Sequence, residues 1–294
     1  RIPVNVEIAS EYRYRTSVPM PNTLIITISQ SGETADTIAA LQHAKSLHNG
    51  MNASTLSICN VPESALIRQS QLRFLTRAGP EIGVASTKAF TTQLSSLFVL
   101  TLVLAKVKGR LSTEQEENYL KQLRHLPAAM QQVLSLEPHI IDWAQDFADK
   151  HHALFLGRGI HWPIAMEGAL KLKEITYIHA ESYAAGELKH GTIALLEEGS
   201  LVVALATQPD LQAKVASNME EVRVRGAHVL AVTNGSWDGA KGHSHEQLQI
   251  EQMDETLAPL CAIVPMQLLA YYLAVQKGCP VDQPRNLAKS VTVE

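Results

Sequence analysis

The chain carries Thr23-Leu24-Ile25-Ile26-Thr27-Ile28-Ser29-Gln30-Ser31-Gly32-Glu33-Thr34 near its start, an apolar run that passes directly into a loop rich in hydroxyls. The residues that follow, 35–47, have the composition of a helix. The start of a helix has unpaired N–H groups and a partial positive charge, which attract anions. Three hydroxyls and a glycine would let an oxyanion approach those groups closely. This stretch therefore predicts a strand that leads into an anion-binding loop, with phosphate as the expected ligand.

Two interpretations of the loop stay open on local chemistry. Thr34 could be an ordinary helix N-cap that binds nothing. The usual nucleotide motifs do not occur: there is no G-x-x-x-x-G-K-[ST], and the Gly157-Arg158-Gly159 turn lacks a third glycine because Trp162 stands at that position. If the loop binds a ligand, a small phosphorylated molecule is favoured over ATP or NAD.

Composition limits the classes of protein to which the chain can belong. Its 294 residues are 46% hydrophobic, enough for two ordinary cores. The net charge is −4 and no basic run is interleaved with aromatic residues, so nucleic acid is not an expected partner. Three cysteines, odd in number and far apart, suit free thiols in a reducing cytoplasm. The longest apolar stretch, 97–105, is much shorter than the roughly 20 residues of a membrane span, so we expect a buried helix there and no membrane partner.

Strand-like apolar runs alternate with longer helical stretches, which is typical of parallel α/β folds. The expected strands are 23–28, 54–59, 153–156, 201–206 and 229–232. Residues 7–13 also resemble residues 178–183, and after each of these stretches the chain continues with an apolar strand, a loop and a further strand. We therefore expect two copies of one structural unit.

The two expected copies differ at their N-terminal ends. In the second copy 48 positions separate Ala153 from Leu201, whereas 22 residues precede Thr23 in the first. The second copy opens with a strand, the 157–159 turn and a helical stretch that have no counterpart in the first. We therefore expect the first copy to be truncated at its N-terminus by about 25 residues, equivalent to one strand, one turn and one helix.

These features divide the chain into four expected parts. The parts are a first unit at 1–110, a helical connector at 111–141, a second unit at 142–279 and a tail at 280–294. In the connector, apolar residues at helical spacing predict an ordered helix packed on both units. Residues 235–246 are rich in Gly, Ser and His and predict a surface loop. His243 and His245 lie in that loop without a third ligand, so no metal site is expected there.

One helical stretch of the second copy gathers ionisable groups. Glu167, Lys171 and Glu174 are spaced i, i+4 and i+7 and share one face. An exposed, salt-bridged face accounts for that spacing as well as a site does. The two small residues that follow Glu167 favour close approach of a ligand or of another backbone. The helix also starts after the 157–159 turn, where the carboxyl ends of parallel strands usually form a site.

Two further segments carry groups with possible chemistry. His190 lies between flexible residues in Gly186-Glu187-Leu188-Lys189-His190-Gly191 and could be structural or functional. Its spacing from Glu187 suits a metal motif, but the second copy of the motif that such sites need is absent from the sequence. In the tail, which could also simply fray, Pro284 restricts the backbone and Lys289 lies between two small residues, as a residue that reaches into a pocket would.

Five motifs occur together in one order along the chain. They are residues 29–34, 81–88, 167–174, 186–191 and 282–294. Together they resemble the sugar isomerase (SIS) region of the glucosamine-6-phosphate synthase family, over essentially the whole chain. The resemblance implies an α/β fold of two flavodoxin-like SIS units, with parallel sheets flanked by helices and the first unit truncated at its N-terminus. It also implies that the chain binds fructose 6-phosphate.

The resemblance also assigns roles to individual residues. The implied phosphate-binding residues are Ser29, Gln30, Ser31 and Thr34, and the implied sugar-binding residues are Val84, Ser86 and Ala288. Glu174 matches the base that moves a proton between C1 and C2 of the sugar, and Lys171 matches a helper in that transfer. His190 matches a ring-opening group that comes from the neighbouring subunit, so a homodimer is implied. Lys289 matches an amine that forms an imine with the ketose, so we expect it in a partly desolvated or cation-rich pocket that lowers its pKa.

The activity that the resemblance implies is a ketose-to-aldose isomerisation in the cytoplasm, without a cofactor. With ammonia from glutamine, released by a glutaminase domain that this chain lacks, the product would be glucosamine 6-phosphate. Because the second copy has no Ser/Gly pattern at 207–210, we expect the first unit to bind phosphate and the second unit, with the tail, to move the proton. Two alternatives remain. One is a related deglycase or phosphosugar isomerase. The other is a non-catalytic sugar-phosphate sensor, which would not need Glu174, His190 and Lys289 together.

Overall fold

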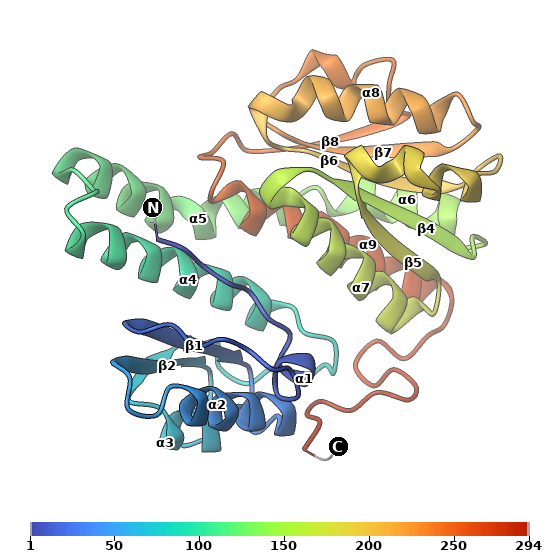
Figure 1. The fold of residues 1–294 in the computed structure, drawn as a ribbon. Helices are drawn as coiled ribbons and strands as arrows, with labels where there is room; N and C mark the ends of the chain where they lie inside the picture. Colours follow the sequence, from blue (N-terminus) through green and yellow to red (C-terminus); the bar gives the residue numbers. More distant parts are fainter. Residues whose placement is uncertain (1, 293–294) are drawn as a thin grey trace. The chain divides into compact units, whose positions relative to one another are not determined.

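The computed structural model describes residues 2–292, and it divides into two compact units (Figure 1). Unit 1 comprises residues 1–107 and 286–294, and unit 2 comprises residues 108–285. All five predicted strands form, and each pairs in parallel with its neighbours. The predicted architecture of parallel sheets flanked by helices is therefore confirmed.

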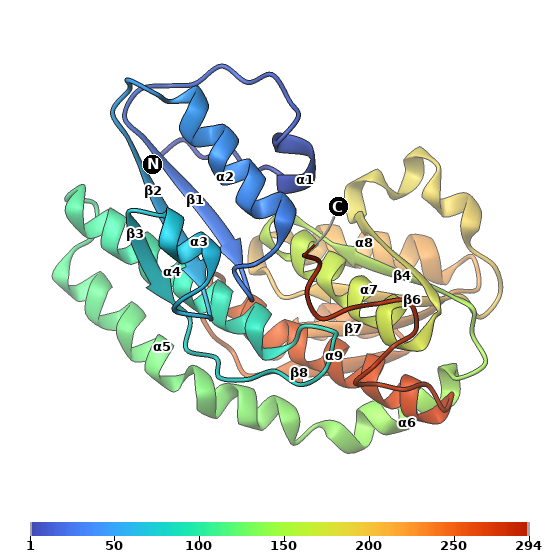
Figure 2. The same ribbon diagram turned by 90° about the horizontal axis from the view of Figure 1, so that it is seen from below.

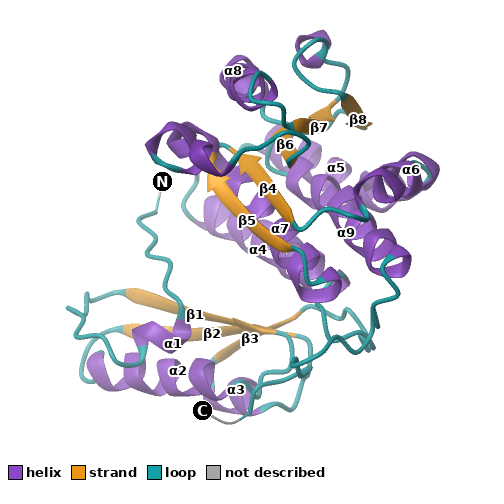
Figure 3. Cartoon of the chain, turned by 90° about the vertical axis from the view of Figure 1, so that its right-hand side faces the viewer, coloured by secondary structure: helices purple, strands orange, loops and turns teal. Residues whose placement is uncertain are grey.

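Unit 1 is built on a three-stranded parallel sheet of order β1-β2-β3. Its elements are α1 Ala9–Tyr12, β1 Thr23–Ser29, α2 Ala35–Leu47, β2 Ala53–Cys59, α3 Ala65–Gln69, β3 Leu72–Leu75 and α4 Lys88–Val107. Helices α2 and α3 cover one face of the sheet and α4 lies on the other (Figures 1 and 3). The predicted passage from a strand into the loop 29–34 and then into a helix is confirmed, since β1 ends at Ser29 and α2 begins at Ala35.

Helix α4 corrects one prediction. The apolar stretch 97–105 is helical as expected, but few of its residues are buried: within α4 only Ala89, Ser96 and Leu102 are. Val103 is 50% exposed. The corresponding last helix of unit 2 is a core helix because other helices pack around it. Helix α4 instead packs on a sheet of only three strands, which covers less of its surface. By length and composition, α4 and the last helix of unit 2 are also long and apolar enough to cross a membrane, and the latter is mostly buried within the protein.

Unit 2 holds a five-stranded parallel sheet of order β5-β4-β6-β7-β8. Its main elements are α5 Thr113–Leu134, α6 Glu137–Phe147, β4 His152–Gly157, α7 Trp162–Thr176, β5 His179–Ala184, β6 Leu201–Ala206, α8 Gln212–Arg223, β7 His228–Asn234, β8 Glu246–Ile250 and α9 Ala258–Gln276. Short 3-10 turns connect several of them. Helix α8 lies on one face of this sheet, while α6, α7 and α9 lie on the other (Figure 1).

The small residues of α7 allow it to pack tightly on its neighbours. A Cβ at Gly168 would lie 2.4 Å from Sδ of Met266 in α9 and 3.1 Å from the ring of Phe155 in β4. Ala169 is buried beside it. The close approach that these residues predict is therefore that of α9 and β4, the core elements that fix the position of α7.

The predicted connector is helical. Helix α5 starts with a capping box between Ser112 and Gln115 and buries Leu126, Ala129 and Val133. It is followed along the chain by α6 (Figure 2). Both helices belong to unit 2. The segment 235–246 is a loop up to the first residue of β8, as predicted. That the connector helix α5 packs on both units stays a prediction.

The two units share an order of elements but differ at their beginnings. Strand β6 of unit 2 lies between β4 and β7, whereas β1 forms an edge in the described part of unit 1. The matched stretches also differ in structure, since Ala9–Tyr12 is a short helix and His179–Ala184 is strand β5. Strand β5 can form because β4 pairs with it along its whole length. The expected truncation of the first unit, by one strand, one turn and one helix, stays a prediction.

Candidate functional site

The loop after β1 is shaped by its own hydroxyls. The N–H of Gly32 donates to Oγ of Ser29 at 3.0 Å, and the N–H of Glu33 donates to Oγ of Ser31 at 3.2 Å. Gly32 has a φ of +68°, and a Cβ there would lie 2.1 Å from Oγ of Ser64. Only glycine therefore fits this turn. The result is a tight loop with hydroxyls at the N-terminus of α2, which is suited to an anion.

Thr34 does not cap the helix that follows it. It occupies the N-cap position of α2, but its side chain makes no cap hydrogen bond. Its Oγ1 lies 3.4 Å from Oγ of Ser29 instead. The first helical N–H, that of Ala35, donates to the carbonyl oxygen of Val291 in the tail at 3.3 Å. The ordinary capping role that Thr34 could have is therefore not what the structure shows.

The tail lies against the same loop within unit 1. Oγ of Ser290 is 3.1 Å from Oγ of Ser31. The adjacent Lys289 donates from Nζ to Oε2 of Glu81 and to the carbonyl oxygen of Gly83, each at 2.7 Å. Lys289, the predicted imine-forming residue, therefore directly precedes a residue that contacts the predicted phosphate loop.

The partner of Lys289 was missed by sequence reasoning. The Glu81 side chain is 5% exposed, and its Oε1 accepts the N–H groups of Thr87 at 2.9 Å and Ala89 at 3.1 Å, at the start of α4. Burial alone would raise the pKa of Glu81, but hydrogen bonds from Lys289 and from those N–H groups outweigh it and lower the pKa. Of the two expected surroundings for Lys289, the cation-rich one is wrong because its charged neighbour is a carboxylate, whereas the side chain is partly desolvated, at 35% exposed.

The implied sugar-binding residues lie on two segments of unit 1. Val84 and Ser86 are half-buried in the loop between β3 and α4, next to the carbonyl of Gly83 that accepts from Lys289. Ala288 is exposed beside Lys289 in the tail. Gln30 is half-buried, and its Oε1 is buried without a hydrogen-bond partner among residues 2–292.

In unit 2, α7 buries a lysine between two carboxylates. Nζ of Lys171 lies 2.7 Å from Oε2 of Glu174 and 3.3 Å from Oε1 of Glu167. The side chain of Lys171 is 4% exposed, against 12% for Glu167 and 21% for Glu174. The alternative of an exposed, salt-bridged surface is therefore wrong. A buried cation that fixes two partly exposed carboxylates can position one of them for proton transfer.

Glu174 does not lie at the carboxyl ends of the strands, where a site on this helix was expected. Helix α7 leaves the carboxyl end of β4, runs back along the sheet and ends at Thr176, three residues before β5. The first residue of β5, His179, pairs with His152 at the amino end of β4. Glu174 is in the last turn of α7 and is therefore near the amino end of the second sheet, whereas the loop 29–34 follows the carboxyl end of β1.

His190 occupies a separate part of unit 2. It ends the 3-10 turn Ala185–His190, and its Nδ1 lies 2.8 Å from Oε2 of Glu187. Both side chains are exposed, at 72% and 65%. Among the described residues of unit 2, no hydrogen bond or ion pair joins His190 to Lys171 or Glu174. An exposed imidazole of this kind is free to meet a group from outside its own unit.

The second-unit counterpart of the anion loop is closed by internal contacts. Thr207, directly after β6, is fully buried, and its Oγ1 is 2.7 Å from Nδ1 of His161. Burial lowers the pKa of His161 to about 4, so this imidazole is neutral at pH 7. Arg158 in the neighbouring turn donates from Nε and Nη2 to Oδ1 of Asn218. This arrangement leaves Thr207 engaged with the core of unit 2.

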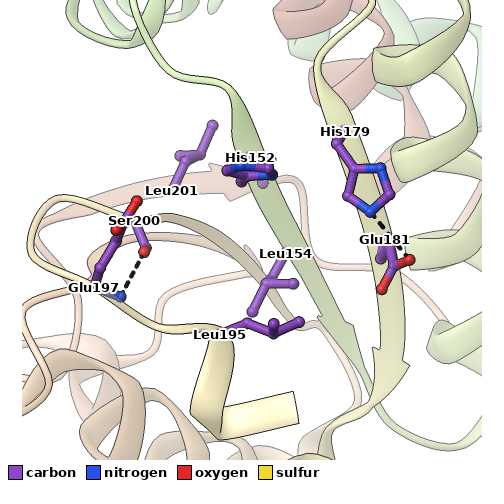
Figure 4. A pocket seen from close by; sticks show the side chains of 9 residues that line it. His152, Leu154, His179, Glu181, Leu195, Glu197, Ser200 and Leu201 are labelled. Carbon is purple, nitrogen blue, oxygen red and sulfur yellow. Dashed lines mark hydrogen bonds and ion pairs between the residues drawn. The ribbon is translucent and has the colours of Figure 1, made fainter.

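A shallow pocket of about 300 Å³ lies elsewhere in unit 2, at the amino ends of β4, β5 and β6 (Figure 4). His152, His179 and Glu181 form its polar side, with His179 3.2 Å from Glu181, and leucines form its apolar side. It includes none of the implied site residues. Within residues 2–292, no group of three or more His, Cys, Asp or Glu side chains could hold a metal ion.

The fold is that of a SIS domain protein, and the family comparison agrees. The SIS domain family matches residues 1–103 and 146–277, and this chain belongs to it. Over 294 residues the chain is 58% identical to the glutamine–fructose-6-phosphate aminotransferase (isomerizing) of Bordetella parapertussis, and over 296 residues it is 56% identical to the protein of the same name from Neisseria meningitidis serogroup A. These alignments cover 100% of this chain and 48% of each relative, so the chain spans about half the length of the curated relatives it matches.

Solved structures give the same assignment. The C-terminal domain of glucosamine-fructose-6-phosphate aminotransferase from Francisella tularensis superposes with a TM-score of 0.90 at 45% identity, covering 96% of this chain and 79% of that one. The resemblance stated from the sequence is therefore confirmed. A putative tagatose-6-phosphate ketose/aldose isomerase from Clostridium novyi has a TM-score of 0.80 at 19% identity, covers 93% of this chain and 71% of its own, and shares the fold.

Proposed function

We propose that this chain binds fructose 6-phosphate and carries out the ketose-to-aldose isomerisation of a glutamine–fructose-6-phosphate aminotransferase. The observation that supports this most is in unit 1. Ser290 contacts Ser31 of the anion loop, and the residue before it, Lys289, is held by Glu81. An amine next to a phosphate-binding loop suits a substrate that has a phosphate at one end and a carbonyl at the other.

In the proposed site the phosphate is held at the N-terminus of α2. Ser29, Gln30, Ser31 and Thr34 supply hydroxyls, an amide and backbone N–H groups, and no metal or cofactor takes part. Val84, Ser86 and Ala288 contact the sugar. This division assigns substrate binding to unit 1, which includes the tail from Asn286 onward.

The proton transfer is assigned to Glu174. Its carboxylate removes a proton from C1 of the open-chain sugar and returns it to C2, which needs one group held over both carbons. The ammonium of Lys171, 2.7 Å away and buried, orients that carboxylate. Lys289 acts as the amine that forms an imine with the C2 carbonyl, with loss of one water molecule. Ammonia then adds at C2 and displaces the lysine amine, or water hydrolyses the imine when ammonia is absent, so that Lys289 is released before the proton moves from C1 to C2.

The proposal includes partners outside this chain. His190 opens the sugar ring in the site of a second subunit, which makes the protein a homodimer; its exposure and its separation from Lys171 and Glu174 within unit 2 support this. A glutaminase domain elsewhere in the full-length protein supplies the ammonia that yields glucosamine 6-phosphate. The protein works in the cytoplasm, in amino-sugar biosynthesis.

Isomerase activity tests the proposal directly. The full-length protein that carries this chain is mixed with fructose 6-phosphate in the absence of glutamine, and glucose 6-phosphate is followed over time. Turnover supports the proposal. Binding of fructose 6-phosphate without turnover would indicate a sugar-phosphate sensor instead, and turnover of a different phosphosugar alone would indicate a related isomerase.

A further inference from the structure

Asn60 directly follows β2 and contacts the anion loop, residues 29–34, through its backbone. Its N–H donates to the carbonyl oxygen of Gln30 at 3.3 Å. Strand β1 pairs with β2 in parallel up to their last residues, so the segments that follow the two strands lie side by side at the carboxyl end of the sheet. The loop that holds the proposed phosphate is therefore attached to the first residue after β2.

The side chain of Asn60 holds a second segment, the turn that follows β3. Its Oδ1 accepts the N–H of Ala78 at 2.8 Å and the hydroxyl of Thr76 at 3.2 Å. Its Nδ2 donates to the carbonyl oxygen of Gly79 at 2.9 Å. One amide side chain thus fixes this turn in unit 1 at the point where β3 has ended.

The backbone of this turn needs such support. Arg77 has a φ of +54°, and Gly79 has a φ of +71°. The left-handed region is unfavourable for a residue with a Cβ, such as Arg77, and it persists where the surrounding contacts hold it. An amide side chain can accept from an N–H group and donate to a carbonyl of the same turn. Asn60 therefore defines the direction in which the chain continues from the turn.

The chain that continues from the turn carries the groups that hold Lys289. Oε2 of Glu81 and the carbonyl oxygen of Gly83 each accept a hydrogen bond from Nζ of Lys289 at 2.7 Å. These two residues follow the turn within four positions of Gly79. The position of the amine therefore depends on the turn, and the turn depends on Asn60.

The tail completes a closed ring of contacts within unit 1. Next to Lys289, Oγ of Ser290 lies 3.1 Å from Oγ of Ser31 in the anion loop. The ring runs from the anion loop through Asn60 and the turn to the lysine, and it returns to the loop through the tail. The spacing between the loop and the amine is thus fixed from two sides.

We propose that Asn60 is a positioning residue for the proposed isomerisation: it sets the spacing between the phosphate-binding loop and the amine of Lys289. This inference rests on the proposed function. Asn60 acts through the turn and Glu81 and not on the sugar itself. Fructose 6-phosphate has a fixed distance between its phosphate and its carbonyl, and a misplacement of about 1 Å can cost about 100-fold in rate, so the spacing governs the rate more than the binding.

Variants of the full-length protein separate the two attachments of Asn60. Asn60→Ala removes the side-chain hydrogen bonds to the turn but keeps the backbone N–H that donates to Gln30. Asn60→Asp keeps both acceptor contacts and loses the donor to Gly79. Asn52→Ala is the matched control. It also removes an asparagine hydrogen bond beside β2, from Nδ2 to Oδ1 of Asn22 at 2.7 Å, but at the amino end of the strand.

We expect Asn60→Ala to lower kcat and the rate of borohydride trapping on Lys289 about tenfold. KM for fructose 6-phosphate and the inhibition constant of inorganic phosphate should stay within about twofold of the wild type, because the backbone link to the anion loop remains. Asn60→Asp should give an intermediate kcat, and Asn52→Ala should match the wild type. Hydrogen exchange at the Ala78 amide should be faster in Asn60→Ala only.

Two outcomes would overturn the inference in a protein whose wild type turns over. One is an unaltered kcat and trapping rate in Asn60→Ala. The other is phosphate binding that weakens as much as kcat falls, which would indicate a general loss of structure. A wild type without turnover would instead refute the proposed function. The acylation rate of Lys289 by acetic anhydride then decides the inference: a faster rate in Asn60→Ala than in the wild type supports it, and equal rates overturn it.

Discussion

Nζ of Lys289 lies 2.7 Å from Oε2 of Glu81, and the other oxygen of the same carboxylate accepts two N–H groups at the start of α4. One nearly buried carboxylate therefore joins the tail to a helix N-terminus in unit 1. The helix N-terminus and the ammonium both favour the charged form of Glu81. Glu81 thereby links the position of the tail to the ionisation of a single group.

The first prediction concerns pH. Because the pKa of Glu81 is lower in the folded protein than in the unfolded chain, its carboxylate stabilises the fold above about pH 4, the unfolded value, and this contribution is lost as the pH falls through the folded pKa. We expect Glu81→Gln to be about 1 to 2 kcal/mol less stable than the wild type at pH 7. The difference should shrink towards zero below pH 4, as measured by urea denaturation from pH 3 to 7.

The matched control is Glu117→Gln, at an exposed position of α5. It should leave the unfolding midpoint within error at every pH. If the unfolding midpoint of Glu81→Gln differed from that of the wild type by the same amount at every pH, Glu81 would not be the titrating group.

A second prediction concerns the shape of the anion loop. Gly32→Ala places a Cβ against Ser64 in a left-handed conformation, so both the steric clash and the backbone cost apply. We expect unit 1 to be destabilised by about 2 kcal/mol or more and the affinity for fructose 6-phosphate to fall at least tenfold. Gly50→Ala is the comparison, since Gly50 also has a positive φ but its Cβ would meet nothing within 4 Å. Equal effects of the two substitutions on affinity would argue against a role for the loop.

A third prediction concerns the buried lysine of α7. Lys171→Met leaves two carboxylates side by side without their cation, so we expect a loss of about 3 kcal/mol of stability. The double variant Lys171→Met/Glu174→Gln should recover part of that loss, because one of the two charges is removed as well. Denaturation of the single and double variants measures this coupling, and strict additivity would mean that the two side chains do not interact.

A fourth prediction separates binding from chemistry. Glu174→Gln keeps the size and most hydrogen bonds of the side chain but removes the base. We expect a fall in isomerase turnover of at least about 100-fold with fructose 6-phosphate affinity retained. Lys173→Gln, one residue earlier on the exposed side of α7, is the control. Turnover near the wild-type rate in Glu174→Gln would remove the assignment of the base.

Strands β2, β4, β6 and β7 could be predicted from their apolar runs because most of their residues are buried. Strand β1 could be predicted from its apolar composition, although only Thr27 and Ser29 in it are buried. The three strands that were missed, β3, β5 and β8, are all edge strands in the described sheets. An edge strand such as Glu246-Gln247-Leu248-Gln249-Ile250 alternates polar and apolar residues, and it forms only because β7 supplies a pairing partner. The same dependence on tertiary contacts explains why α4 could be predicted as a helix but not its exposure.

For the candidate site, residue types and order in sequence predicted the anion loop and the charged helix. They could not predict that Lys171 is buried, since the spacing of an ion pair is the same on an exposed and on a buried face. They could not find Glu81 either, because its partner Lys289 is 208 positions away in the sequence.

Lys289 is proposed to be the amine that reacts with the sugar, and reductive trapping would identify that amine. The full-length protein is incubated with fructose 6-phosphate and borohydride, digested, and the modified peptide is identified by mass spectrometry, with Lys289→Met as the control. We expect one sugar adduct, on Lys289, and none in the variant. An adduct on another lysine, or turnover at the wild-type rate by Lys289→Met, would contradict it.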